Sequence, residues 1–168
     1  MSPSNEYTFC RREGLPSRDR LGLTETIEAS LKAAGVRVEL FNGVVTEPTL
    51  PSIEAAEAMY RERSCDLIVG VGGGSSMDSA KAVGLLIGNG GKFTDYTEKR
   101  VGTEWQRGRP IDRKGPDVIT VPTTAGTGAD VTAGCGVFDL ATGIKGWAGG
   151  PRSFRNVDEV LSLLKNAY

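Results

Sequence analysis

Histidine is entirely missing from this chain of 168 residues. No imidazole of this chain can therefore act as a general base, as the partner of a nucleophile or as a metal ligand. Cysteine is scarce as well, since Cys10, Cys65 and Cys135 are odd in number and far apart. This spacing favours reduced thiols over a disulfide framework or a zinc site, and it predicts a cytoplasmic protein.

Long apolar runs and a strong charge of either sign are also lacking. No apolar run approaches the length of a transmembrane helix, and residues 1–6 lack the basic-then-apolar order of a signal peptide. The net charge of −1 gives no reason to expect nucleic acid or a membrane as a partner. With 39% hydrophobic and 24% charged residues, the chain is typical of one soluble globular domain with a modest core.

Glycine is abundant at 23 residues, and the most informative stretch is residues 66–81. Residues 66–71 form a short apolar run, typical of a strand that is buried on both faces. The three glycines at 72–74 have no Cβ, so the chain can turn sharply and a ligand can approach the backbone. Ser75 and Asp78 then predict a capping-box-like pair at the start of a helix. The residues at helical spacing on its apolar face are Met77, Ala80, Val83 and Ile87.

This strand–turn–helix directs free N–H groups and a positive helix end at one spot, which suits an anion such as a phosphate. The glycine spacing is neither G-x-G-x-x-G nor a Walker P-loop. A tight turn without any ligand is the alternative interpretation. Asp78 and Lys81 lie three residues apart and could form a catalytic pair, but an ion pair on one helix face is favoured.

The rest of the chain alternates between helical and strand patterns. This order predicts an α/β fold with a parallel, doubly wound sheet and right-handed crossovers. Residues 88–116 are predicted to form a long loop. We expect helices over 24–34, from Ser52 onward and over 156–167, and the second of these should have Ile53, Ala56 and Tyr60 facing inward. Strands are expected over 36–40 and 117–122, and a hairpin should pair 135–138 with 144–147.

Two motifs together resemble the iron-containing (group III) alcohol dehydrogenase family. They are Gly-Gly-Gly-Ser-Ser-Met-Asp-Ser-Ala-Lys at 72–81 and Pro-Thr-Thr-Ala-Gly-Thr-Gly-Ala-Asp-Val-Thr at 122–132. The resemblance covers most of the chain from about residue 23 to residue 145. It implies a Rossmann-like, dehydroquinate synthase-like domain that binds NAD or NADP and acts on a small alcohol or aldehyde. It also implies a second, helical domain that holds a divalent metal, usually iron, on one Asp and three His.

The same resemblance implies which residues contact the coenzyme. In the pyrophosphate turn these are Gly73, Gly74, Ser75, Ser76 and Asp78, with the N–H groups of 74–76 as donors. In the second loop these are Thr123, Thr124 and Thr127, whose hydroxyls could reach ribose or phosphate oxygens. A threonine-rich turn without a ligand is the less favoured alternative, because ligands of open α/β sheets bind at this end. Lys145 matches a lysine that lies near the nucleotide in the family. The other interpretation is that Lys145 is a solvated lysine on a hairpin.

Both ends of the chain depart from the family pattern. Residues 1–22 are interpreted as an eroded, poorly ordered segment, with Arg12 where the family has an acidic residue that holds the adenosine ribose. Residues 23–147 are interpreted as the nucleotide-binding domain. Residues 148–168 are interpreted as a linker and a remnant of the family's last helix. The helical domain and its metal ligands are then almost entirely absent.

Two functional hypotheses follow. In the first, the chain is a family oxidoreductase that keeps the dinucleotide-binding motifs and lacks the metal ligands, so no catalytic residue is assigned. Activity would then need a second chain that supplies the metal domain. In the second, the chain is an inactive nucleotide-binding or interaction module, whose uncovered apolar face favours a homo-oligomer or a partner chain.

Overall fold

The computed structural model describes residues 6–10, 23–44, 46–101 and 103–150. Within this part of the chain a four-stranded sheet has the order β2-β1-β3-β6. All three strand pairs are parallel, and β3 runs beside β6 from Leu67 opposite Asp117 to Gly72 opposite Pro122. The strands are β1 (Glu6–Cys10), β2 (Arg37–Phe41), β3 (Leu67–Gly72) and β6 (Asp117–Pro122). The prediction of a parallel α/β fold is therefore confirmed.

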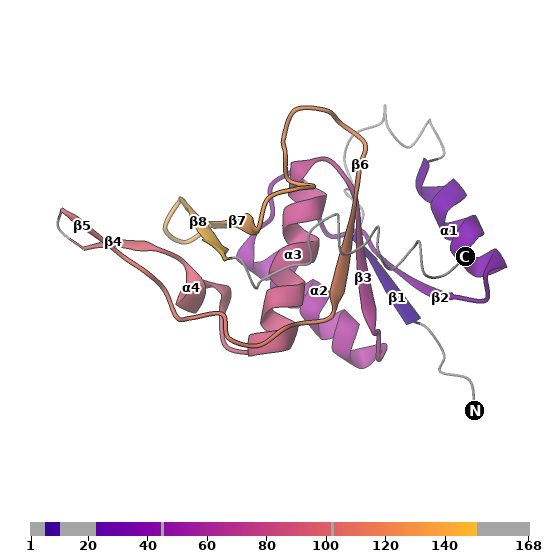
Figure 1. Ribbon diagram of the computed structural model, residues 1–168, viewed down its shortest axis with the longest axis horizontal. Coiled ribbons are helices and arrows are strands. Elements are labelled where there is room, and N and C mark those ends of the chain that lie inside the picture. The colour runs from indigo at the N-terminus through magenta and orange to yellow at the C-terminus, as the bar shows by residue number, and fades with distance from the viewer. Residues whose placement is uncertain (1–5, 11–22, 45, 102, 151–168) are drawn as a thin grey trace.

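Helices cover both faces of this sheet (Figure 1). Helix α1 (Leu23–Ala33) lies on one face, and α2 (Leu50–Glu62) and α3 (Gly74–Asn89) lie on the other. Successive side chains of β3 alternate between the two faces, so Ile68 joins the cluster around α2 and α3 while Val69 packs with Ile27 and Leu31 of α1. Burial on both faces is the reason for the continuous apolar run in β3.

Helix α2 begins earlier than its sequence pattern indicates. Its N-cap is Thr49 rather than Ser52, and the two residues form a capping box. The hydroxyl of Ser52 accepts from the Thr49 N–H at 3.0 Å, and the Ser52 N–H donates to Thr49 Oγ1 at 3.4 Å. The predicted inward residues of this helix are buried, namely Ile53, Ala56 and Tyr60.

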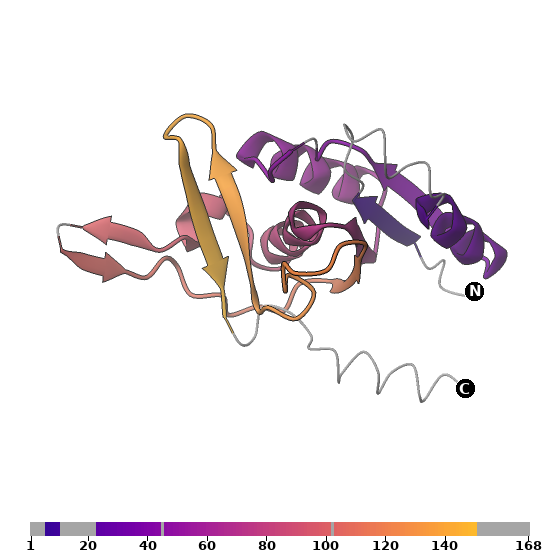
Figure 2. The ribbon, with the colours of Figure 1, turned by 90° about the horizontal axis from the view of Figure 1, so that it is seen from above.

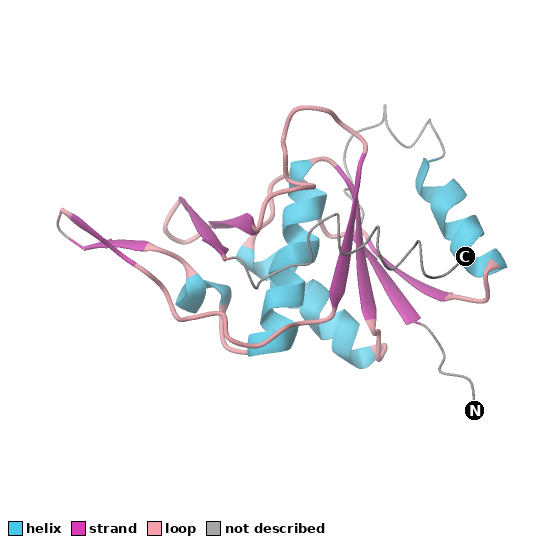
Figure 3. Ribbon diagram, viewed as in Figure 1, coloured by secondary structure: helices cyan, strands magenta, loops and turns pink. Residues whose placement is uncertain are grey.

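The predicted loop over 88–116 is wrong in part, because short elements interrupt it. Helix α4 (Phe93–Tyr96) is followed by an antiparallel hairpin of β4 (Lys99–Val101) and β5 (Glu104–Gln106). The hairpin projects away from the sheet (Figure 3). Phe93 and Tyr96 are buried, and the Tyr96 hydroxyl donates to the Gly90 carbonyl at 2.6 Å. Elements of three or four residues are too short to carry a periodic signal.

A second antiparallel hairpin closes the described part of the chain, as the sequence predicts. It pairs β7 (Gly134–Asp139) with β8 (Ile144–Gly149). Viewed from above, it lies beside α3 and is separate from the parallel sheet (Figure 2). Cys135, Val137 and Ala148 belong to the same core cluster as the buried faces of α2 and α3. The hairpin is therefore an integral part of the core on that side.

The N-terminal expectation needs one correction. Residues 6–10 form β1 between β2 and β3, so this part of the expected poorly ordered segment is a central strand. Arg12 and the closing helix predicted over 156–167 lie outside the described residues. The division of the chain at residues 22 and 147 remains a prediction. No helix in the described ranges is long and apolar enough to cross a bilayer.

Candidate functional site

The glycine turn opens the N-terminus of α3 at the carboxyl end of β3. Gly72 has φ of 143°, and a Cβ there would lie 2.6 Å from Ser76 Oγ, so only glycine fits. Gly73 is the N-cap, and no side chain caps the helix. The Ser76 N–H already donates to the Gly73 carbonyl at 3.1 Å. The N–H groups of Gly74 and Ser75 are thus the donors of the first turn that lack a helical acceptor.

The predicted capping pair of Ser75 and Asp78 is wrong. Ser75 Oγ donates to the Thr46 carbonyl at 2.9 Å, and Asp78 Oδ2 accepts from the Gly136 N–H at 3.0 Å. Both side chains therefore tie the start of α3 to other segments, namely the loop before α2 and strand β7. The helix end keeps its free N–H groups because neither side chain folds back onto it.

The threonine loop meets the glycine turn directly. The Thr123 N–H donates to the Gly72 carbonyl at 2.8 Å. A Cβ at Gly74 would lie 3.3 Å from Thr127 Cγ2, so the two loops approach closely and a side chain at position 74 would crowd Thr127. Thr124 is half-buried and Thr127 is exposed, with Thr127 Oγ1 accepting from the Ala129 N–H at 3.4 Å. The two predicted loops therefore meet where parallel sheets bind their ligands.

One hydroxyl at this junction lacks a partner. Ser76 is fully buried, and its Oγ has no hydrogen-bond partner among the described residues. It lies against the backbone of Gly72, because that is where a Cβ would approach it. Buried polar groups are nearly always paired in folded proteins. An unpaired hydroxyl beside a phosphate-type turn fits a site that is completed by a ligand.

Lys145 lies close to the start of α3 but is paired with a side chain that sequence reasoning missed. Its Nζ contacts Glu47 Oε2 at 2.6 Å, and both side chains are about half exposed, at 50% and 51%. A Cβ at Gly136 would lie 2.8 Å from Lys145 Cε and 3.7 Å from Asp78 Oδ2. Lys145 thus lies next to Asp78 at one side of the glycine turn. Glu47 is 98 residues away along the chain, and no local pattern could have indicated it.

Asp78, which is partly buried, and Lys81, which is buried, are charges on one face of α3. Their closest atoms, Oδ1 and Nζ, are 3.9 Å apart, so the favoured ion pair is present. Burial raises the pKa of the Asp78 carboxyl, while the Gly136 N–H and then Lys81 act to lower it. Burial lowers the pKa of the Lys81 ammonium, and Asp78 acts in the opposite direction. Removing these two charges from water costs free energy, which their mutual attraction and their hydrogen bonds offset.

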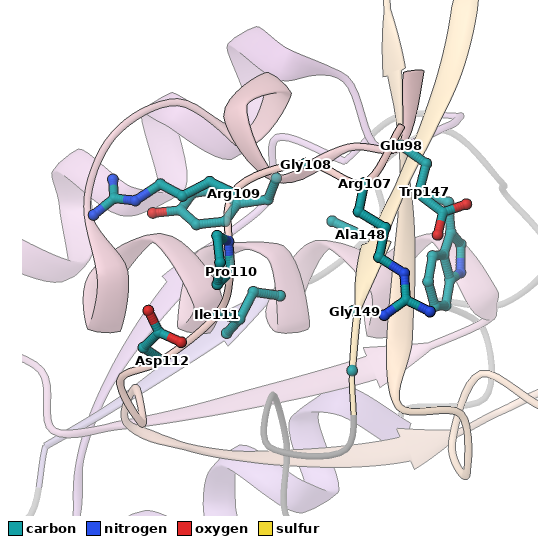
Figure 4. Close-up of a pocket in the computed structure, with 12 residues that line it drawn as sticks. Glu98, Arg107, Gly108, Arg109, Pro110, Ile111, Asp112, Trp147, Ala148 and Gly149 are labelled. Atoms are coloured by element: carbon teal, nitrogen blue, oxygen red, sulfur yellow. The ribbon is translucent and has the colours of Figure 1, made fainter. Parts of the chain in front are cut away.

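Two cavities flank the β7–β8 hairpin, and neither is lined by a residue of the glycine turn. One, of about 560 Å³, lies between residues 107–112 and β8 (Figure 4). In its wall Arg109 lies over the Tyr96 ring, with the guanidinium 5.5 Å from the ring centre. The other, of about 680 Å³, has Lys145 in its wall, together with apolar side chains such as Phe93 and polar ones such as Thr97. Sequence reasoning assigned no role to the segment that lines the first cavity.

Comparison with known proteins places this geometry in a family. The sequence model of iron-containing alcohol dehydrogenases matches residues 15–154. The chain belongs to the iron-containing alcohol dehydrogenase family. It is 37% identical over 136 residues to the choline dehydrogenase of Bacillus subtilis, and 32% identical over 124 residues to the NAD-dependent methanol dehydrogenase of Bacillus methanolicus. These matches cover 81% and 74% of this chain.

The solved structure of a 1,3-propanediol oxidoreductase has the same fold as this alcohol dehydrogenase family member. The TM-score is 0.75 at 27% identity, and the match covers 89% of this chain and 36% of the other. The chain spans about a third of the length of the curated relatives, 32% of the choline dehydrogenase and 30% of the methanol dehydrogenase. The similarity therefore concerns one part of an alcohol dehydrogenase.

The described residues offer no group of side chains that fits the iron site that the family name implies. The sequence has no histidine. In the ranges that the structure describes, no three Cys, Asp or Glu side chains come together as a possible metal-ligand group. The glycine turn instead fits an anionic group such as a phosphate, because the free N–H groups of Gly74 and Ser75 lie at the start of α3 beside the Ser76 hydroxyl, which has no partner among the described residues.

Proposed function

We propose that these 168 residues bind NAD or NADP and supply the coenzyme half of an alcohol or aldehyde oxidoreductase. The observation that carries the proposal is the junction of the glycine turn with the threonine loop at Gly74 and Thr127. A pair of loops over the carboxyl ends of β3 and β6 is the arrangement in which open parallel sheets hold dinucleotides. The name of the NAD-dependent relative from Bacillus methanolicus supports the same cofactor class.

Each part of the junction has a role in this proposal. The N–H groups of Gly74 and Ser75 and the positive end of α3 would hold the pyrophosphate. The Ser76 hydroxyl would gain the partner that it lacks among the described residues. The hydroxyls of Thr123, Thr124 and Thr127 would donate to ribose or phosphate oxygens. Gly73 and Gly74 would let the coenzyme approach the backbone.

Two further side chains shape the edge of this site. Asp78 would position the turn through the Gly136 N–H. Lys145 would face the nucleotide after exchanging its Glu47 partner for a phosphate or ribose oxygen, which costs little because an exposed ion pair is weak. The two residues would therefore act at one side of the glycine turn.

Hydride transfer by the family's metal-dependent route is not part of this proposal for the chain alone. The bound coenzyme supplies hydride chemistry, and the family's metal would polarise the alcohol or carbonyl oxygen. Because these 168 residues include no histidine, we propose that they are inactive alone and that any metal ligands come from outside them. The substrate class, small alcohols or aldehydes, is proposed from the family. A cytoplasmic location is proposed from the three cysteines, which are odd in number and far apart in the sequence.

Isothermal titration of the purified chain with NAD and NADP, each with and without added iron or zinc, tests the proposal. We expect saturable binding of at least one coenzyme, unchanged by metal. Thr127→Val keeps the shape of the side chain and removes its hydroxyl, so it should weaken binding roughly five- to tenfold, the value of one hydrogen bond of about 1 kcal/mol. Thr103→Val, at the exposed turn of the β4–β5 hairpin, is the matched control. No heat with either coenzyme would contradict the proposal.

A second candidate function is a module that associates with another copy of itself. Four large apolar side chains on or beside the β7–β8 hairpin are exposed: Val131 at 69%, Leu140 at 63%, Ile144 at 64% and Trp147 at 50%. Three of them belong to the hairpin itself, and exposed apolar surface favours protein association. In sedimentation velocity, the sedimentation coefficient of the natural chain should rise with concentration, and that of Trp147→Lys should rise less. Thr103→Lys adds the same charge elsewhere and should behave like the natural chain. A monomer at every concentration would exclude this function.

A further inference from the structure

Lys81 is a charged residue in an unusual place. It lies on α3 with only 2% of its surface exposed. Its Nζ donates to the Thr132 carbonyl at 2.9 Å, to Thr132 Oγ1 at 3.1 Å and to the Gly134 carbonyl at 3.1 Å. An ammonium has three N–H donors, so these acceptors match its full donor capacity. All three belong to the segment that leads from the threonine loop into β7.

Asp78 holds the next part of the same segment from the same face of α3. Its Oδ2 accepts from the Gly136 N–H at 3.0 Å. The two charged residues thus contact Thr132, Gly134 and Gly136, alternate positions of one backbone. Helix α3 therefore fixes the end of the threonine loop through hydrogen bonds as well as through apolar packing.

The beginning of the threonine loop is fixed separately. The Thr123 N–H donates to the Gly72 carbonyl at 2.8 Å, and Thr120 Oγ1 donates to the Asp130 carbonyl at 3.3 Å. Within the loop, the Thr132 N–H donates to the Gly128 carbonyl at 3.1 Å. The loop is thus attached to β3 at one end and to Lys81 at the other, with Thr127 between the two attachments.

A buried ammonium is costly, and an apolar side chain of similar volume often serves packing better. The cost is offset when the charge fixes backbone groups that would otherwise be unpaired. At Lys81 those groups are carbonyls beside the proposed coenzyme loop. Because Lys81 itself is almost inaccessible, its effect on a ligand must act through that loop.

We propose that Lys81 is a positioning residue that holds the threonine loop over the glycine turn and so sets the affinity for a dinucleotide. This inference rests on the proposed function, because the coenzyme is taken to touch both loops. It adds that the end of the second loop is placed by a side chain of the first motif. A ligand that touches the glycine turn alone would then be insensitive to Lys81.

Hydrogen exchange tests the attachment without any ligand. Lys81→Met keeps an unbranched side chain that is one atom shorter and removes its donors. Amides of residues 123–134 should exchange at least about tenfold faster in this variant, because several hydrogen bonds of the loop are lost together. Amides of α1, on the other face of the sheet, should be unchanged. Lys32→Met, an exposed lysine paired with Glu28, is the matched control. Unchanged loop exchange, or acceleration throughout the chain, would overturn the proposal.

Affinity measurements then test the effect on the ligand. NAD should bind Lys81→Met about tenfold more weakly, while inorganic pyrophosphate, which fits the glycine turn alone, should change less than about twofold. Equal weakening of both ligands would overturn the positioning role. Thr132→Val removes one acceptor without emptying the Lys81 site, and it should shift exchange and NAD affinity in the same direction to a smaller extent. This variant decides the question if Lys81→Met fails to fold. Failure of the natural chain to bind NAD would overturn the proposed function, while the exchange result would still decide whether Lys81 anchors the loop.

Discussion

At the scale of single residues, Gly70 shows how closely β3 and α3 pack. A Cβ at this position would lie 2.8 Å from the Ala80 Cβ and 3.1 Å from the Ser76 carbonyl oxygen. Gly70→Ala should therefore lower the free energy of unfolding by about 1–3 kcal/mol, the usual cost of overpacking. Urea denaturation measures the change. Ser30→Ala, on the exposed face of α1, is the control and should stay within about 0.5 kcal/mol of the natural chain. Equal stability of the two variants would contradict the tight contact.

Tyr60 links stability to high pH. Its pKa is raised from 10.0 to about 12, first by burial and then by the negative charges of Cys65 and Asp66. The folded chain holds the phenol proton more tightly than the unfolded chain does, so the protonated Tyr60 contributes to stability. This contribution is complete below pH 10 and is lost as the pH rises to about 12. The free energy of unfolding, measured by urea denaturation across this range, should fall. Tyr60→Phe has no phenol proton, so its free energy of unfolding should fall less over the same range. Parallel curves for the two proteins would contradict the assignment of this pH dependence to Tyr60.

At the scale of elements, the start of α2 depends on a reciprocal cap. The N-cap residue Thr49 and Ser52 exchange backbone-to-side-chain hydrogen bonds. Thr49→Ala should lower the free energy of unfolding by about 1 kcal/mol, because the Ser52 N–H at the helix start loses its acceptor, Thr49 Oγ1. Thermal or urea unfolding gives the value. Thr103→Ala, at the exposed turn of the β4–β5 hairpin, should be neutral, and an equal loss in both variants would argue against the cap.

The start of α3 shows what local patterns cannot predict. The sequence predicts the strand, the turn and the helix, because apolar runs and helical spacing are local. It wrongly pairs Ser75 with Asp78, whose actual partners are Thr46 and Gly136, 29 and 58 residues away. A capping motif only offers a local hydrogen bond, and tertiary contacts can outcompete it. The site loops were predicted by their motifs, whereas the contacts that hold them were not.

At the scale of the whole molecule, the helices on the two faces of the sheet are buried to different extents. Helix α3 lies between the sheet and the β7–β8 hairpin, and most of its residues from Ser76 to Leu86 are buried. Helix α1 contributes only partly buried side chains to the smaller cluster on the other face. Amides of α3 should therefore exchange only through global unfolding, and those of α1 through local opening. Hydrogen exchange under native conditions measures both, and similar protection of the two helices would contradict this order.

The projecting β4–β5 hairpin has a practical consequence. Its turn lies at the end of the molecule away from β6 and the junction with the glycine turn (Figure 1). Chain tips of this kind tolerate added residues, because few contacts depend on them. A fluorophore attached at Thr103, or a short tag inserted beside it, would therefore report on the protein without obstructing the proposed coenzyme site. The segment that carries no periodic signal in the sequence is thus the best place on this chain for a label.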